Sequence, residues 1–111
     1  MTISDAGDIV VVPFPFSDLP VAKPRPALVV SGSASNDREG TTLLAMITTA
    51  SGSKPGDTPV QDGEQAGLKA ASVLRLKLFT LDNRLIARRI GSLTARDRRA
   101  ARVAVSRLFA L

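Results

Sequence analysis

Short apolar runs separated by polar segments rich in glycine and proline fill most of this chain, a pattern typical of a β protein. The runs are rich in Val, Ile, Leu and Thr and have the length of strands in a small sheet. They predict strands over residues 8–13, 26–31, 41–49, 58–61, 72–78 and 84–91. Between them, residues 14–24, 32–40 and 50–56 are polar or rich in Gly, Ser and Pro, so we expect connections without regular structure there.

The predicted strand over residues 72–78 has the clearest alternation of apolar and basic positions. Leu74, Leu76 and Leu78 share one face, and Arg75 and Lys77 share the other. Because side chains alternate between the two faces of a strand, this segment is expected to bury its leucines and expose a basic face.

From Thr94 onward the apolar spacing changes to that of a helix. Thr94 is a suitable N-cap, and Asp97 three residues later completes a box-like start that also complements the helix dipole. The predicted apolar arc consists of Ala101, Ala104, Val105, Leu108 and Leu111. Six short strands and one terminal helix predict a mainly β protein with some α structure, built on a small, strongly bent antiparallel sheet or barrel.

Composition narrows the possible chemistry. The 111 residues have the size of one domain, which we expect to span 1–111. The sequence contains no cysteine and no histidine, which excludes disulfides, thiolate metal sites and a histidine-dependent triad. Acidic residues are scattered singly, so we expect neither a metal nor a cofactor. Since no apolar segment reaches the roughly 18 residues of a membrane span, we expect a cytoplasmic protein without membrane contact.

Charge is distributed unevenly along the chain. Residues 1–82 carry seven Lys/Arg and nine Asp/Glu, a net charge of −2, whereas residues 83–111 carry eight arginines and one aspartate, a net charge of +7. This asymmetry indicates a polyanion or an acidic protein as the partner. The alternative is a solvated basic helix face that only maintains solubility.

The segment Lys23-Pro24-Arg25-Pro26 places an arginine between two prolines at the start of an apolar strand. A residue that precedes proline is restricted to extended geometry, and proline restricts its own φ. Arg25 therefore lies on a stiff, extended backbone. Its planar guanidinium is suited to binding a phosphate with two hydrogen bonds. The alternative is a strand that simply begins after a proline turn.

Six pieces of the sequence together resemble the MazF/PemK family of toxin–antitoxin endoribonucleases, in its PemK-like branch. They occur in the order and spacing of that family and span nearly the whole chain. The pieces are residues 7–16 (GDIVVVPFPF), 25–31 (RPALVVS), 46–49 (MITT), 72–76 (SVLRL), 78–82 (LFTLD) and 90–94 (IGSLT).

The resemblance implies an SH3-like antiparallel barrel, of the kind that the CcdB and MazF toxins share, with a C-terminal helix. It implies a homodimer that cuts single-stranded RNA, such as mRNA, without a metal. It also implies a cognate antitoxin whose disordered, often acidic segment lies across the RNA-binding surface.

The family's usual catalytic pair corresponds to Arg25 and Thr48 in this sequence. Thr49 and Ser51 lie where substrate-contacting hydroxyls often occur, and Arg75 matches an arginine that one branch also uses in catalysis. From its charge, Lys23 is a further candidate for phosphate contact.

This sequence departs from other members of the family at their acid–base residues. The branch that uses the arginine at position 75 has an aspartate two residues later, where this chain has Lys77. Residues 21–24 read Val-Ala-Lys-Pro, so the acid that some members have just before the arginine is absent too.

Two other functions remain open on the sequence. The CcdB toxins poison DNA gyrase on the same barrel, so the fold alone does not decide between RNA cleavage and gyrase inhibition. Some members of the family use a histidine in the first loop, which this chain also lacks. The missing acid and histidine leave open a catalytically silent module that binds RNA or an antitoxin.

Overall fold

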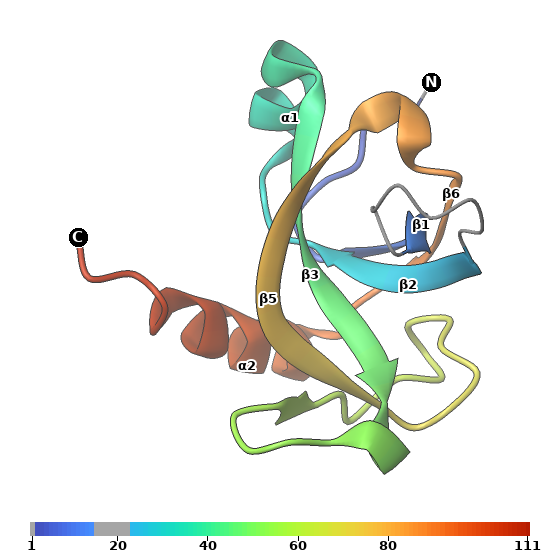
Figure 1. The fold of residues 1–111 in the computed structure, drawn as a ribbon, viewed down its shortest axis with the longest axis vertical. Helices are drawn as coiled ribbons and strands as arrows, with labels where there is room; N and C mark the ends of the chain where they lie inside the picture. The colour runs from blue at the N-terminus through green and yellow to red at the C-terminus, as the bar shows by residue number, and fades with distance from the viewer. Residues whose placement is uncertain (1, 15–22) are drawn as a thin grey trace.

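The computed structural model describes residues 2–14 and 23–111. Over these residues the backbone forms six strands, two α-helices and two short 3₁₀ turns (Figure 1). The strands are β1 (Asp8–Phe14), β2 (Lys23–Val29), β3 (Thr41–Thr49), β4 (Thr58–Pro59), β5 (Ser72–Asp82) and β6 (Arg88–Ser92). The helices are α1 (Ser33–Glu39) and α2 (Ala95–Ser106), and the 3₁₀ turns are η1 (Ala50–Gly52) and η2 (Asn83–Leu85).

All the described strands join one antiparallel sheet in the order β4-β5-β3-β2-β1-β6. The register of β3 against β5 shifts between Ala45 and Met46, and that of β1 against β6 shifts between Ile9 and Val10. Such irregularities bend strands and increase their twist. Figure 1 shows β5 curving along its length. The predicted bent antiparallel sheet with a terminal helix is confirmed.

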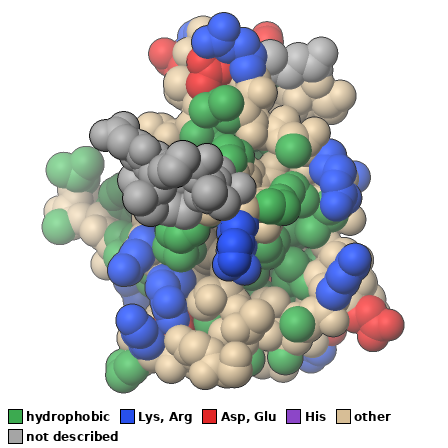
Figure 2. Space-filling view, turned by 45° about the vertical axis from the view of Figure 1, so that its right-hand side comes forward, with side chains coloured by type: hydrophobic (Ala, Val, Ile, Leu, Met, Phe, Trp, Pro, Cys, Tyr) green, Lys and Arg blue, Asp and Glu red, His purple; other side chains and the backbone are tan. Residues whose placement is uncertain are grey.

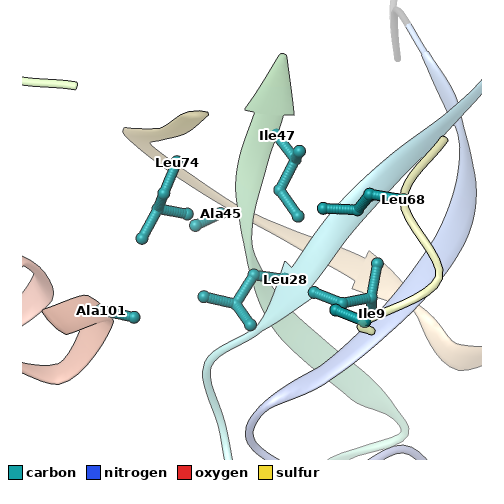
Figure 3. Close-up of a cluster of buried hydrophobic side chains, with 8 residues drawn as sticks. Ile9, Leu28, Ala45, Ile47, Leu68, Leu74 and Ala101 are labelled. Carbon is teal, nitrogen blue, oxygen red and sulfur yellow. The ribbon is translucent and has the colours of Figure 1, made fainter. Parts of the chain in front are cut away.

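Both faces of this sheet are partly buried. The first apolar cluster contains Ile9, Leu28, Ala45, Ile47, Ala66, Leu68, Leu74 and Ala101 (Figure 3). The second contains Val10, Val12, Ala27, Val29, Leu44 and Leu81. Neighbours in sequence such as Ile9 and Val10 belong to different clusters because successive strand side chains point to opposite faces. This arrangement explains why the central strands have continuous apolar runs.

Within residues 32–40, where the sequence predicted an irregular connection, residues 33–39 form a helix. The helix α1 is polar and has no apolar periodicity, so the local sequence does not indicate it. Contacts with distant parts of the chain hold it instead. Asn36 is fully buried, and its amide donates hydrogen bonds to the carbonyl oxygens of Ser4 (2.9 Å) and Ser31 (3.1 Å). Gly40 ends the helix at φ 73°, a left-handed conformation that glycine adopts without strain.

The strand predictions hold with changes at their ends. The segment 41–49 is confirmed residue for residue, 72–78 extends to Asp82, and 58–61 is reduced to two residues. The predicted strand over 84–91 is wrong in its first part, because η2 occupies 83–85. There the Asp82 carboxylate accepts a hydrogen bond from the Arg84 backbone N–H and caps the turn. Most of the loop predicted over 14–24 lies outside the described residues.

Helix α2 begins after Thr94 as predicted, but the predicted capping box is not formed. The Thr94 hydroxyl donates to Asp62 instead (2.6 Å). The buried Asp97 carboxylate accepts hydrogen bonds from the backbone N–H groups of Gln61 (2.8 Å) and Asp62 (2.7 Å). The N-terminus of α2 therefore holds the connection over 60–71 to the rest of the molecule.

The apolar arc predicted for α2 is correct only in part. Ala101 and Ala104 are buried, but the helix ends at Ser106. Leu108 and Leu111 therefore lie beyond it and are exposed. No helix in the described part of the chain is long and apolar enough to cross a membrane.

The connection over 60–71 passes closely over β6. A Cβ atom at Gly91 would lie 2.2 Å from the carbonyl oxygen of Ala66, and one at Gly67 would lie 2.3 Å from the carbonyl oxygen of Ile90. Gly67 also has φ +89°, where a side chain is strained. Only glycine permits this crossing. Leu68, which belongs to the first cluster, anchors the connection from inside.

Candidate functional site

A groove of about 930 Å³ opens beside the part of β2 that extends past β3. Its lining comes from β1, β2, β3, β5, β6 and the connection over 60–71. It includes Phe14, residues 24–27, 46–49 and 67–70, Phe79, and residues 88–90. Figure 2 shows Lys and Arg side chains spread over one face, with acidic side chains at its top and its lower right edge. The groove thus has apolar walls and a basic rim.

The prolines of β2 account for the open side of the groove. β2 pairs with β1 from residue 23 to 28, but with β3 only from Ala27 onward. Pro24 and Pro26 have no backbone N–H to donate, and prolines in sheets occur at free edges. The segment that carries Arg25 therefore borders the groove rather than another strand.

Arg25 and Thr48, which the resemblance implies as a catalytic pair, line the same groove. Ala27 is paired with Met46, so the register of β2 and β3, continued by two residues, sets Arg25 opposite Thr48. Opposite residues of antiparallel strands present their side chains on the same face. Arg25 is exposed and Thr48 is half-buried.

Three cationic side chains at the groove make no hydrogen bond or ion pair with another described residue: those of Arg25, Lys69 and Arg88. All three are exposed. Arg89 also lines the groove, but its Nε is paired with the Asp8 carboxylate (3.0 Å). The three unpaired side chains are therefore available to a bound anion.

The other predicted site residues lie at the border of the groove. Thr49 lines it, and the hydroxyls of Thr49 and Ser51 are 3.0 Å apart. Ser51 is exposed in η1, just outside the lining. Lys23 is exposed at the start of β2, opposite Phe14 of β1.

Arg75 lies outside the groove lining and is bound to other residues of the chain. Its Nε and Nη2 donate to the two carboxylate oxygens of Asp57, at 3.2 and 2.8 Å, and Nη2 also donates to the Gly52 carbonyl at 2.7 Å. These hydrogen bonds lower the pKa of Asp57 and raise that of Arg75. The side chains are only 15% and 5% exposed.

The sequence of residues 5–109 matches the family model described as the PemK-like, MazF-like toxin of type II toxin–antitoxin systems. The chain belongs to this toxin family. The resemblance inferred from the six sequence pieces is thereby confirmed.

Solved structures agree with this membership. The MazF toxin of Deinococcus radiodurans superposes with a TM-score of 0.77 at 23% identity, over 100% of both chains. The Mycobacterium tuberculosis toxin MazF-mt6 does so with a TM-score of 0.73 at 25% identity, over 94% of this chain and 97% of that one. A mycobacterial endoribonuclease in complex with its cognate antitoxin has a TM-score of 0.73 at 16% identity, over 96% and 93%. None of the curated proteins matches the toxin.

Sequence reasoning missed two of the toxin's unpaired cations. Arg88 is one of the eight C-terminal arginines, which the charge distribution alone does not tell apart. Lys69 lies in a connection without periodicity. Only the passage of that connection beside β6 brings the two to one groove.

Proposed function

We propose that the toxin is an endoribonuclease that binds single-stranded RNA in this groove. The observation that supports this most directly is that Arg25 lines the same groove as Thr48, with an exposed side chain that has no partner among the described residues. The guanidinium of Arg25 can bind a phosphodiester with two hydrogen bonds and stabilise the charge that develops on it, and the Thr48 hydroxyl lies in the same basic groove.

In the proposed reaction the RNA supplies its own nucleophile. The 2′-oxygen forms a bond to the adjacent phosphorus and loses its proton, the bond from phosphorus to the 5′-oxygen breaks, and the leaving oxygen gains a proton. The products are a 2′,3′-cyclic phosphate and a free 5′-hydroxyl. DNA, which lacks the 2′-hydroxyl, is not cut.

Arg25 stabilises the negative charge that develops on the phosphate oxygens of the transition state. A guanidinium is a poor general base, because its pKa lies above about 12. Thr48 orients the 2′-hydroxyl or the phosphate by a hydrogen bond. Without a base of near-neutral pKa, the rate is expected to be modest. We propose that the reaction needs no divalent metal or other cofactor.

Further contacts extend along the bound strand. Lys69 and Arg88 supply unpaired charges on the groove lining, and Lys23 supplies a further charge at the start of β2. Each contact with a phosphate releases counterions, so the affinity for RNA should depend on salt. Thr49, with Ser51 behind it, offers hydroxyls to the nucleotide next to the cleavage site.

We also propose that the toxin forms a homodimer and that a cognate antitoxin binds it. The solved relatives include a MazE–MazF complex of Deinococcus radiodurans, 22% identical with a TM-score of 0.76. A disordered acidic segment of an antitoxin would be attracted to the same cations as RNA. Antitoxin and RNA should therefore compete for the groove.

The experiment is cleavage of a mixed-sequence RNA by purified toxin in EDTA. The wild type should cut RNA and leave DNA of the same sequence intact. Arg25→Ala should lower the rate by a factor of about 10² to 10³, the scale of removing one transition-state donor. Thr48→Val, which removes a hydroxyl but keeps the shape, should lower it by about five- to tenfold. Arg99→Ala removes an exposed arginine of α2 outside the groove and should retain full activity.

Circular dichroism of each variant separates loss of activity from loss of fold. Intact RNA with the wild-type toxin would refute the proposal. Intact RNA together with stalled DNA gyrase would favour the gyrase-poisoning alternative.

A further inference from the structure

Arg75 has a different environment from the cations of the groove. Its guanidinium donates two hydrogen bonds to Asp57 and one to the Gly52 carbonyl, and its side chain is 15% exposed. Those bonds occupy Nε and Nη2, which together form one of the edges with which an arginine can bind a phosphate through two hydrogen bonds. A phosphate could use this edge only by displacing a carboxylate that is itself almost buried.

The residues that Arg75 binds belong to the connection between β3 and β4. Asp57 closes a turn on Lys54, whose backbone N–H donates to the Asp57 carboxylate (2.7 Å) while the Asp57 N–H donates to the Lys54 carbonyl (3.1 Å). Gly52 ends η1. Arg75 therefore ties both ends of the segment 52–57 to β5.

This segment begins at the rim of the groove. Thr49 is the last residue of β3 and lines the groove, and η1 follows directly. The Thr49 and Ser51 hydroxyls lie 3.0 Å apart. The geometry of these two hydroxyls thus depends on how the segment that follows them is held.

We propose that Arg75, through its ion pair with Asp57, is a positioning residue that holds the Thr49–Ser51 hydroxyl pair at the groove rim and so sets which RNA sequence is cut. The inference rests on the proposed RNA cleavage. Arg75 does not touch the RNA. Its partner carboxylate comes from Asp57, which lies 18 residues earlier in the chain.

Substitution on both sides of the ion pair distinguishes positioning from phosphate contact. If Arg75 only positions, then Arg75→Ala and Asp57→Ala weaken binding to the same extent, about tenfold for a coupling of this kind, and the double variant is no worse than either one. If Arg75 contacts phosphate, Asp57→Ala frees the guanidinium and binding is retained or strengthened, whereas Arg75→Ala alone weakens it.

Salt dependence and a lysine variant give independent readouts. Binding is measured with 2′-O-methyl RNA, which has no nucleophilic hydroxyl and is not cut. Positioning predicts that Arg75→Ala leaves the slope of log Kd against log salt unchanged, whereas loss of a phosphate contact lowers it by about 0.7. Arg75→Lys keeps the charge but not the two-pronged geometry, so it should behave like Arg75→Ala. Binding retained by Arg75→Lys would contradict the proposal.

Arg84→Ala is the matched control. Arg84 makes the same two-pronged pair with Asp82, but the arginine is 78% exposed and the pair joins residues two apart in sequence. Its removal should leave both affinity and cleavage pattern unchanged.

The cleavage pattern tests the second half of the proposal. On a defined transcript, Asp57→Asn and Arg75→Lys should cut at additional sites. Hydrogen exchange should show loss of protection at the Lys54 amide in both variants. If the Lys54 amide lost its protection from exchange but the RNA cleavage sites stayed the same, the proposed role of Arg75 in sequence selectivity would be overturned. If the wild type cut no RNA at all, the proposed function would fail, while binding to 2′-O-methyl RNA would still test the ion pair.

Discussion

Replacing Asp97 with asparagine should destabilise the toxin strongly, although the side chain keeps its size. The carboxylate is 3% exposed, and its two oxygens accept hydrogen bonds from the backbone N–H groups of Gln61 and Asp62 at 2.8 and 2.7 Å. An asparagine has one acceptor oxygen, so one of these N–H groups would face an amide NH₂ instead.

The magnitude follows from these two bonds. A hydrogen bond to a charged group contributes about 1.5–3 kcal/mol, and a buried donor left without a partner costs about 1–3 kcal/mol. The lost charge also stood in the first turn of α2, where it is favourable by several tenths of a kcal/mol. We expect a total of about 2–4 kcal/mol, a large part of the roughly 5–15 kcal/mol of a small domain.

Urea denaturation and thermal melting followed by circular dichroism measure this loss. The melting temperature should fall by roughly 10 °C. Asp37→Asn is the control, because Asp37 is exposed on α1, makes no hydrogen bond with another described residue, and should stay within about 0.5 kcal/mol of the wild type. Equal stability of the Asp97 and Asp37 variants would refute the reasoning.

Three further predictions concern the crossing over β6, the acid range and the groove. Gly91→Ala would bring a Cβ to 2.2 Å from a backbone carbonyl oxygen and should cost at least about 1–3 kcal/mol in urea denaturation, whereas Gly52→Ala meets nothing within 4 Å and should be neutral. Hydrogen bonds, chiefly from Arg96, lower the pKa of Asp62 to about 2, below the ordinary 3.8. Its stabilisation is therefore present above about pH 4 and lost as the pH falls toward 2, so melting curves of Asp62→Asn and wild type should converge in acid. Arg88→Ala should weaken binding of 2′-O-methyl RNA and lower the salt slope by about 0.7, and an unchanged slope would remove Arg88 from the interface.

Local sequence signals predicted most of the sheet. The run over 41–49 is apolar and β-branched, and it forms a strand with those bounds. The spacing of Ala101 and Ala104 predicts a helix with one buried face, and α2 buries both residues and begins after Thr94. Helix α1 could not be predicted in the same way. Six of its seven residues are polar, and the hydrogen bonds of Asn36 go to residues as distant in sequence as Ser4.

The candidate site was predictable only where it carries a local motif. The two prolines around Arg25 indicate a stiff, extended backbone from the sequence alone, and the family resemblance adds Thr48. No local pattern connects Arg75 to Asp57, since Asp57 lies in the irregular connection between β3 and β4, whereas Arg75 lies in β5. The same holds for Lys69, which reaches the groove only because its connection crosses β6.

By itself, the sequence determined the strand-rich architecture, the position of the terminal helix and the stiff, extended backbone at Arg25. These features depend on residues within a few positions of one another. Only the tertiary structure decided which charges are free and which are neutralised by a partner. It leaves Arg25, Lys69 and Arg88 without a partner among the described residues and pairs Arg75 and Arg89 with carboxylates. The reason is physical: an ion pair forms where the fold brings two charges within about 4 Å, and that distance depends on how the strands and connections pack rather than on their order in the chain.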